Sequence, residues 1–215
     1  QAQDNKMRLL VFLALRILAL MTVESLLSRA NANWAAPAYV AGSVLVTAWL
    51  AGQNRLYLVR LSVVLHIVLA TLVYNYEQAL ALVGVPLDAK TDIAKRLKGW
   101  PEAGAKVSAL LKAHPDSVLM SDDRKLMASL SYYVRPHPLN AVKWNPGGRV
   151  HDTFDLNSRF EPDQRSYLFV TERESIEEIK GQFAQAADLG RILQVIQPGF
   201  AIEMHAFRLS GFKGN

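Results

Sequence analysis

The sequence predicts two parts: α-helical transmembrane segments, about three spans of a larger multi-span fold, and then a small soluble α/β domain. Three apolar stretches open the chain, at residues 7–23, 35–51 and 56–76. Each has, or nearly has, the roughly 20 apolar residues that a helix needs to cross a bilayer core. After residue 87 no such stretch follows, and helical and strand-like patterns alternate instead.

The charges divide the chain in the same way. Of its 24 basic and 19 acidic residues, residues 1–86 carry only six and three. The remainder has the polarity of an ordinary globular protein and about the length of one domain. We therefore predict a transmembrane region at 1–86, a juxtamembrane connector at 87–99 and an α/β domain at 100–215.

Basic residues near the apolar stretches predict the orientation in the membrane. Lys6 and Arg8 precede the first stretch, and Arg55 and Arg60 flank the turn between the second and third. Basic residues favour the cytoplasmic side, so the loop after the first stretch and the C-terminal domain are predicted on the outer side. Arg29 and the basic residues of the connector oppose this orientation.

The start of the chain suggests that further spans precede it. It begins with Gln1, and Arg16 interrupts the first apolar stretch. A signal peptide is the alternative, but Arg16 would break its apolar region and no small-residue cleavage site precedes a soluble domain. We expect the C-terminal portion of a longer multi-span protein.

The first half of the C-terminal domain predicts a helix, a strand, a helix and a strand. Pro101 suits the first turn of a helix that ends before residue 114. Residues 117–121 form a short apolar strand, and Asp122 or Asp123 can cap the next helix, 124–134. Another strand is predicted at 141–144 and ends at the Asn-Pro-Gly-Gly sequence.

The second half predicts a strand at 166–171, a helix at 174–187 and two strands, 191–197 and 201–209, around a Pro-Gly turn. In the helix, Ile176, Ile179 and Phe183 would face inward. The order of elements indicates an α/β domain with a mostly buried central sheet.

Few sequence features carry specific chemistry. Cysteine is absent, which excludes disulfides and thiolate chemistry in this chain and fits an oxidising compartment. No basic stripe with interleaved aromatic residues indicates nucleic acid, and no Gly-rich phosphate loop occurs.

The H-D-x-x-D sequence at 151–155 could hold a metal, but a solvated polar loop is the expectation, and no metal site is predicted. Glu203 and His205 share a strand face that is predicted to point outward, and His66 is assigned to helix packing or an interhelical hydrogen bond.

The strongest candidate for a binding site is the predicted outer loop. It places a carboxylate, a guanidinium, an amide and two aromatic rings at a membrane surface, on Glu24, Arg29, Asn33, Trp34 and Tyr39. The aromatic rings are explained equally well as interfacial anchors, and the guanidinium as a contact to lipid headgroups. A site for a phosphate-linked lipid and its sugar is the functional alternative, because Arg binds phosphate bidentately, Asn binds hydroxyls and Trp stacks on sugar rings.

Two further segments combine charges with aromatic residues. The first, at 96–102, reads RLKGWPE, and the second, at 121–133, reads SDDRKLMASLSYY. A linker with an anchor explains the first, and a capped core helix explains the second. Tyr132 and Tyr133 are adjacent in that helix and cannot both face one site.

Taken in order, RANANWAAPAY at 29–39, RLKGWPEAGAKV at 96–107 and SDDRKLMASLSYYV at 121–134 resemble bacterial family 39 glycosyltransferases, the protein-mannosyltransferase-like and aminoarabinose-transferase-like membrane enzymes. The resemblance runs from Glu24 to about Trp144. The chain departs from the family at Ala35 and Ala36, where a proline is expected before the second small residue.

The resemblance implies sugar transfer from a polyprenyl-phosphate-linked donor to a lipid, glycan or protein acceptor of the cell envelope. It implies a multi-pass protein of the bacterial inner membrane with a periplasmic C-terminal domain. The family's catalytic carboxylate lies in an early outer loop with no counterpart here, so no catalytic residue is predicted in this chain. Arg29 is the implied phosphate contact, and Asn33 and Trp34 the implied sugar or carrier contacts. The alternative is a membrane anchor that displays a non-catalytic binding or assembly domain.

Overall fold

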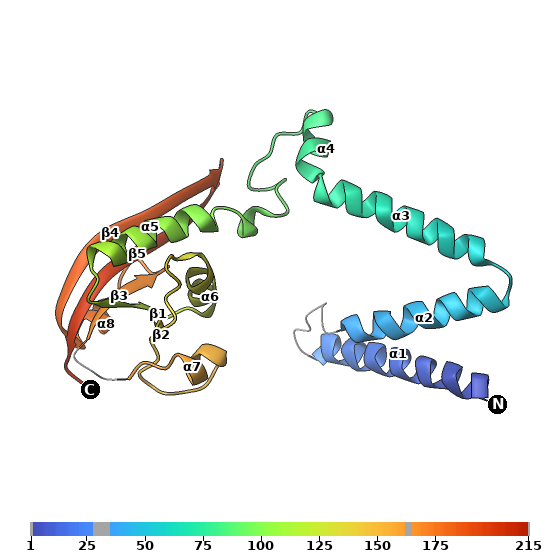
Figure 1. The fold of residues 1–215 in the computed structure, drawn as a ribbon, viewed down its shortest axis with the longest axis horizontal. Coiled ribbons are helices and arrows are strands. Elements are labelled where there is room, and N and C mark those ends of the chain that lie inside the picture. The colour runs from blue at the N-terminus through green and yellow to red at the C-terminus, as the bar shows by residue number, and fades with distance from the viewer. Residues whose placement is uncertain (1, 28–34, 162–164, 215) are drawn as a thin grey trace. The chain divides into compact units, whose positions relative to one another are not determined.

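The computed structural model describes residues 2–27, 35–161 and 165–214. The chain divides into two compact units, Gln1–Ala79 and Leu80–Asn215 (Figure 1). The first consists of helices and the second is built on a β-sheet, as the change in composition predicts.

The first unit contains α1 (Ala2–Leu27), α2 (Ala36–Gly52) and α3 (Leu56–Tyr74), and α4 (Tyr76–Leu82) follows. Helices α1 and α2 pack against each other, and small side chains are buried in this unit at Ala14, Ala38 and Ala41. Small residues let two helix backbones approach closely, as in membrane helix pairs.

Most of the apolar surface of these helices is not covered by protein. No residue of α3 is buried, although most of its side chains are apolar. The hydroxyl of Thr71 donates a hydrogen bond to the carbonyl of Ile67 in the same helix, which satisfies a polar group without water. A helix that is apolar all round is stable inside lipid or a protein core.

Two of the helical segments are long and apolar enough to cross a membrane. They are Arg8–Leu27 and Leu56–Tyr74, with 20 and 19 residues and mean hydropathies of 2.1 and 2.2. Helix α2 is also apolar but has only 17 residues. Of the three predicted spans, the first and third therefore form helices of spanning length, and the second forms a shorter one.

The second unit contains a five-stranded mixed sheet in the order β2-β1-β3-β5-β4. Strands β1, β2 and β3 are parallel, and β3, β5 and β4 are antiparallel. The strands are β1 (Ser117–Ser121), β2 (Val142–Lys143), β3 (Ser166–Thr171), β4 (Phe183–Gln197) and β5 (Phe200–Phe212). The predicted α/β domain is thus present, with β4 as a largely exposed edge strand.

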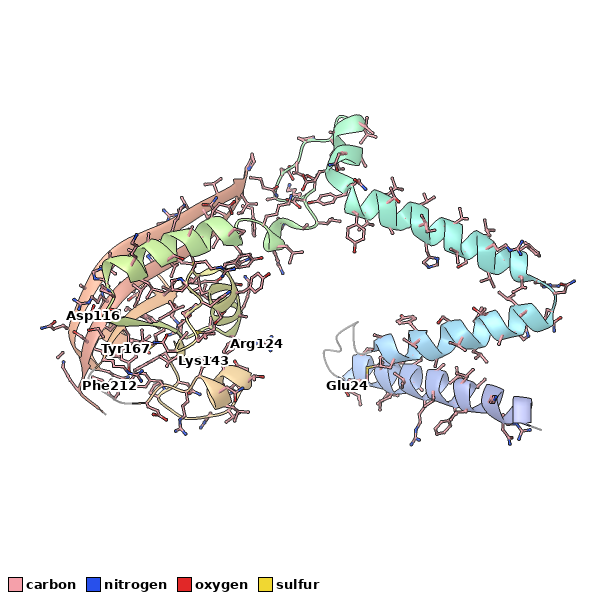
Figure 2. All side chains as sticks on the ribbon, viewed as in Figure 1. Glu24, Asp116, Arg124, Lys143, Tyr167 and Phe212 are labelled. Carbon is pink, nitrogen blue, oxygen red and sulfur yellow. The ribbon has the colours of Figure 1, made fainter. Side chains whose placement is uncertain are left out.

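Successive residues of β1 and β3 are mostly apolar and point to opposite faces of the sheet. Apolar side chains therefore cover both faces. On one face Leu119 and Leu168 pack with α5 (Trp100–Ala113) and α6 (Arg124–Tyr133). On the other face the core includes α8 (Glu177–Lys180) and a set of aromatic rings (Figure 2). Those rings belong to Trp144, Phe160, Tyr167, Phe183 and Phe212.

The predicted helix at 174–187 is wrong. Only α8 forms there, and β4 begins already at Phe183, which pairs with Phe212 of β5. Ile176, Ile179 and Phe183 are buried as expected, but from a helical turn and a strand rather than from one helix face. Pairing with β5 along one side of β4 supplies backbone hydrogen bonds there, and this tertiary contact outweighs the helix preference of its alanines.

Residues 87–99, the predicted connector, pack against the turn between β4 and β5. Gln197 Nε2 donates to the carbonyl of Asp88 at 2.7 Å, and the amide of Ala89 donates to the carbonyl of Pro198 at 3.3 Å. The buried carboxylate of Asp92 pairs with Lys98 Nζ at 2.8 Å. The connector therefore has a fixed structure on the second unit.

Candidate functional site

Most of the predicted outer-loop site falls outside the residues that the structure describes. These are Arg29, Asn33 and Trp34, in the segment 28–34. Glu24 lies near the end of α1 (Figure 2) and is half-buried. Tyr39, near the start of α2, is 67% exposed. Since α1 and α2 pack as a pair joined by this segment, Glu24 and Tyr39 lie at the same end of the pair.

A second candidate lies in the sheet domain, at the carboxyl ends of β1 and β3. After β1 the chain enters α6 on one face of the sheet, and after β3 it enters α8 on the other. Ligands of open α/β sheets bind where the connections diverge in this way. Two ion pairs lie here: Arg173 Nε contacts Asp122 at 2.7 Å, and Lys125 contacts Glu172 at 3.7 Å.

A pocket of about 310 Å³ adjoins this edge. Its walls come from the connector, α5, α6, the end of β3 and the start of β5. The lining side chains that carry charge or an aromatic ring are Arg96, Trp100, Lys125, Glu172, Phe200 and Glu203. The two further segments identified in the sequence, 96–102 and 121–133, therefore meet at one site, although 20 residues or more separate Arg96 from Lys125.

Trp100 lies in the wall of this pocket and contacts both Arg96 and Lys125. It is buried, its Nε1 donates to the carbonyl of Arg96 at 3.1 Å, and Lys125 Nζ lies 5.6 Å from its ring centre. Glu203 is held at 2.5 Å from Arg191 Nε on the neighbouring strand. Cations that donate and carboxylates that accept, beside an aromatic wall, suit a ligand rich in hydroxyl groups. Both carboxylates of the pocket, Glu172 and Glu203, are in ion pairs. The pocket is therefore better suited to binding a ligand than to transferring a proton.

The H-D-x-x-D sequence is not a solvated loop, so that expectation is wrong. Asp152 caps α7 (Thr153–Asn157), and the side chains of Asp152 and Asp155 are only 8% and 1% exposed. Lys143 Nζ lies between them, at 2.5 Å from Asp152 and 3.1 Å from Asp155. Within the described residues, no group of three or more His, Asp or Glu residues could hold a metal ion.

Hydrogen bonds in this cluster favour the charged forms of Asp155 and Lys143. The backbone N–H of His151 is the main cause that lowers the pKa of Asp155, to about 2, against the opposing effect of burial. Burial lowers the pKa of Lys143, but its hydrogen bonds to Asp152 and Asp155 outweigh burial and raise it above the ordinary value. The cluster is a structural ion network whose lysine the sequence alone did not connect to the loop.

The remaining polar residues that the sequence singled out lie outside the Trp100 pocket, apart from Glu203, and the Nε2 of His205 makes no hydrogen bond within the described residues. Glu203 is exposed as expected, but His205 beside it is half-buried, and its Nε2 lies 3.8 Å from Glu203. His66 Nδ1 contacts the carbonyl of Ser62 at 2.6 Å, so its hydrogen bond lies within α3. Tyr132 is exposed while Tyr133 is half-buried against α5, as adjacent helix positions require.

Comparison with known proteins connects both units to one enzyme. No family model and no solved structure matches the chain. The lipid A galacturonosyltransferase RgtD of Rhizobium johnstonii is 26% identical over 197 residues, which is 91% of this chain. The chain spans 39% of that relative's length. The match supports a relationship to glycosyltransferases and, with the two apolar helices, association with a membrane.

The extent of the match decides which sites it includes. A stretch of 197 residues in a chain of 215 contains residues 19–197 wherever it begins. It therefore includes the outer loop from Glu24 to Tyr39 and both segments that meet at the Trp100 pocket.

Proposed function

We propose that this chain is part of a membrane glycosyltransferase of the family 39 type. It moves a sugar from a polyprenyl-phosphate carrier to an acceptor on the periplasmic side of the inner membrane. The observation that carries the proposal is the match to a lipid A glycosyltransferase over both the helical unit and the sheet domain. A match that runs through the helices, the loop and the domain supports an architecture shared with that enzyme rather than an unrelated anchor joined to a soluble domain.

The outer loop is the proposed site for the carrier. Arg29 would contact its phosphate, because a guanidinium binds phosphate through two parallel hydrogen bonds and stabilises the negative charge that develops as phosphate leaves the sugar. Asn33 and Trp34 would contact the sugar or the first carrier units, with Glu24 and Tyr39 at the same end of the helix pair. No side chain of this chain is proposed as the catalytic base.

The Trp100 pocket is proposed to select the acceptor. A lipid acceptor is favoured over a glycan or a protein, because the relative acts on lipid A. The headgroup of such a lipid carries hydroxyl and phosphate groups, which suit the mixed charges and the aromatic wall of the pocket.

Transfer from a labelled donor tests the proposal. Membranes containing the complete encoded protein would be incubated with a radiolabelled polyprenyl-phosphate sugar, and lipid, glycan and protein fractions would be counted separately. Label in the lipid fraction that depends on the protein supports the proposal. No transfer to any fraction, with the protein correctly inserted, would favour the binding or assembly domain instead.

A matched pair of variants tests the role of the pocket. Arg96→Gln with Lys125→Gln should raise the KM for the acceptor while the KM for the donor is unchanged. Arg149→Gln, an exposed cation elsewhere in the domain, is the control for lost charge. An equal effect on the donor's KM would contradict acceptor selection.

A further inference from the structure

A second pocket of the sheet domain lies at the amino end of β1, away from the carboxyl ends that form the Trp100 pocket. It has a volume of about 430 Å³, within the range of small-molecule sites. Its walls are the last turns of α5, the start of β1 and the loop that follows α6. Apolar surface comes from Leu111, Leu119 and the prolines of that loop, Pro136 and Pro138.

The charged residues that line this second pocket all have basic side chains. Lys112, Arg135 and His137 line it, and none of the described residues in its wall is acidic. The nearby Asp116 is not in the wall, and it is paired with Arg208 at 2.5 Å. Lys112 and Arg135 have no carboxylate partner among the described residues. Two permanent positive charges beside an apolar cavity attract an anion whose remaining part is apolar.

Hydrogen bonds fix Arg135 at the rim of the pocket. Its Nη1 donates to the carbonyls of Tyr132 and Val134, the latter at 2.9 Å, and lies 3.1 Å from His137 Nδ1. The backbone amide of Arg135 donates to the hydroxyl of Ser108 on α5 at 2.9 Å. The guanidinium is therefore held in place before any ligand binds, which lowers the entropic cost of binding.

A buried hydroxyl in the wall has no partner. The Oγ of Ser117, at the first position of β1, is buried and makes no hydrogen bond within the described part of the chain. A buried polar group without a partner is costly, and such groups in folded proteins call for an explanation. This oxygen has almost no accessible surface, so it belongs to the packing of the wall and is not counted as a contact to a ligand.

We propose that this second pocket binds a phosphate monoester of an apolar alcohol. The charge of such a group, about −1.5 to −2 near neutral pH, matches the two permanent cations better than the single charge of a carboxylate does. Its oxygens can accept from Lys112 and Arg135 together, and the apolar part lies against the leucine and proline wall. This site is separate from the outer loop and the Trp100 pocket, so it stands whether or not the chain transfers sugar.

Phenyl phosphate is a suitable probe because it is soluble and combines a phosphate monoester with a small apolar group. The full chain would be purified in dodecyl maltoside, a detergent without charge or phosphate, and binding would be followed by saturation-transfer NMR. Three compounds serve as comparisons. Inorganic phosphate lacks the apolar part, phenol lacks the anion, and benzoate carries a carboxylate in place of the phosphate. We expect phenyl phosphate to bind most tightly of the four.

Three single substitutions locate the site. Lys112→Gln should raise the Kd for phenyl phosphate about tenfold, the equivalent of losing about 1.4 kcal/mol. Arg135→Gln should also weaken binding, because it removes the other permanent cation of the wall. Arg124→Gln removes one exposed positive charge from α6, outside the pocket wall, and should bind like the wild type.

The outcomes separate the possibilities. Equal Kd values for wild type, Lys112→Gln and Arg135→Gln would overturn the site. Inorganic phosphate binding as tightly as phenyl phosphate would overturn the apolar component and leave a simple anion site. Tighter binding of benzoate would overturn the choice of phosphate over carboxylate.

Discussion

Lys143 Nζ lies 3.1 Å from Asp155 Oδ1, in an ion pair whose side chains are 9% and 1% exposed. Asp155 also accepts hydrogen bonds from the amide of His151 and from Asn145 Nδ2. The pair thereby joins the end of β2 to the loop that carries α7. A buried ion pair of this kind stabilises the folded domain only while both members remain charged and hydrogen-bonded.

This cluster makes stability depend on pH in the acid range. The pKa of Asp155 is lowered from 3.8 to about 2, chiefly by the amide of His151. The unfolded chain then binds more protons than the folded one between these values, so stability falls as pH drops through this window and is fully present above it. Asp155→Asn should weaken this dependence, measured as urea midpoints from about pH 2 to pH 6. Identical profiles for the variant and the wild type would refute this role of Asp155.

Gly104→Ala should destabilise the sheet domain even though alanine is the better helix former. A Cβ at position 104 of α5 would lie 2.7 Å from the Cβ of Tyr133 and 2.8 Å from its backbone in α6. The propensity gain is about 1 kcal/mol, while overpacking between two helices typically costs about 1–3 kcal/mol. Thermal unfolding measures the balance. Gly181→Ala is the matched control, because its Cβ meets only ordinary contacts at 3.6 Å or more, and it should be neutral or stabilising.

The sheet domain should be more stable with its connector than without it. A fragment of residues 87–215 keeps the hydrogen bonds from Gln197 to Asp88 and from Ala89 to Pro198, and a fragment of 100–215 loses them. At about 1 kcal/mol for each hydrogen bond, the difference should be roughly 1–3 kcal/mol in urea unfolding. Gln197→Ala in the longer fragment should reproduce part of the loss. Equal midpoints for both fragments would mean that the connector only rests on the turn.

Local patterns predicted most of the sheet domain. Helices α5 and α6 and strands β1, β2 and β3 lie where proline, capping aspartate and apolar periodicity placed them, and Asp123 caps α6 through the amide of Leu126. Helix α7, between β2 and β3, was not predicted. The error at 174–187 arose because spacing alone cannot distinguish one inward helix face from a short turn followed by a strand. What decides there is β5, a partner that lies later in the chain and pairs with β4 along its length.

The candidate sites were predictable to different degrees. The sequence already indicated the segments that contain Trp100 and Lys125. Their meeting at one pocket depends on the tertiary fold, which brings the connector close to the start of α6. Nothing in the sequence links Lys143 to Asp155, because their contact requires the chain to turn back after β2. The second pocket could not be foreseen either, since Lys112 and Arg135 line one cavity only in the folded domain.

The sheet domain should lie on the periplasmic side. The expectation comes from the basic residues Lys6, Arg8, Arg55 and Arg60, which favour the cytoplasm at the opposite ends of the helices. Alkaline phosphatase fused after Asn215 should be active in a bacterial host, since it matures only outside the cytoplasm. An inactive phosphatase, together with an active cytoplasmic reporter at the same position, would reverse the orientation.

Arg29→Ala should reduce sugar transfer without affecting insertion. Arg29 is placed by its sequence in the outer loop beside Asn33 and Trp34, against the charge bias that should exclude a basic residue there. A charge-assisted hydrogen bond is worth about 1.5–3 kcal/mol, so transfer at limiting donor should fall roughly ten- to a hundredfold. Arg29→Lys should restore only part of the rate, because a point charge replaces a bidentate fork. Arg124→Ala removes an equal charge from the sheet domain and should leave transfer unchanged. If Arg29→Ala inserts normally and transfers sugar at the wild-type rate, Arg29 contacts only lipid headgroups, and the assignment of the carrier site to this loop fails.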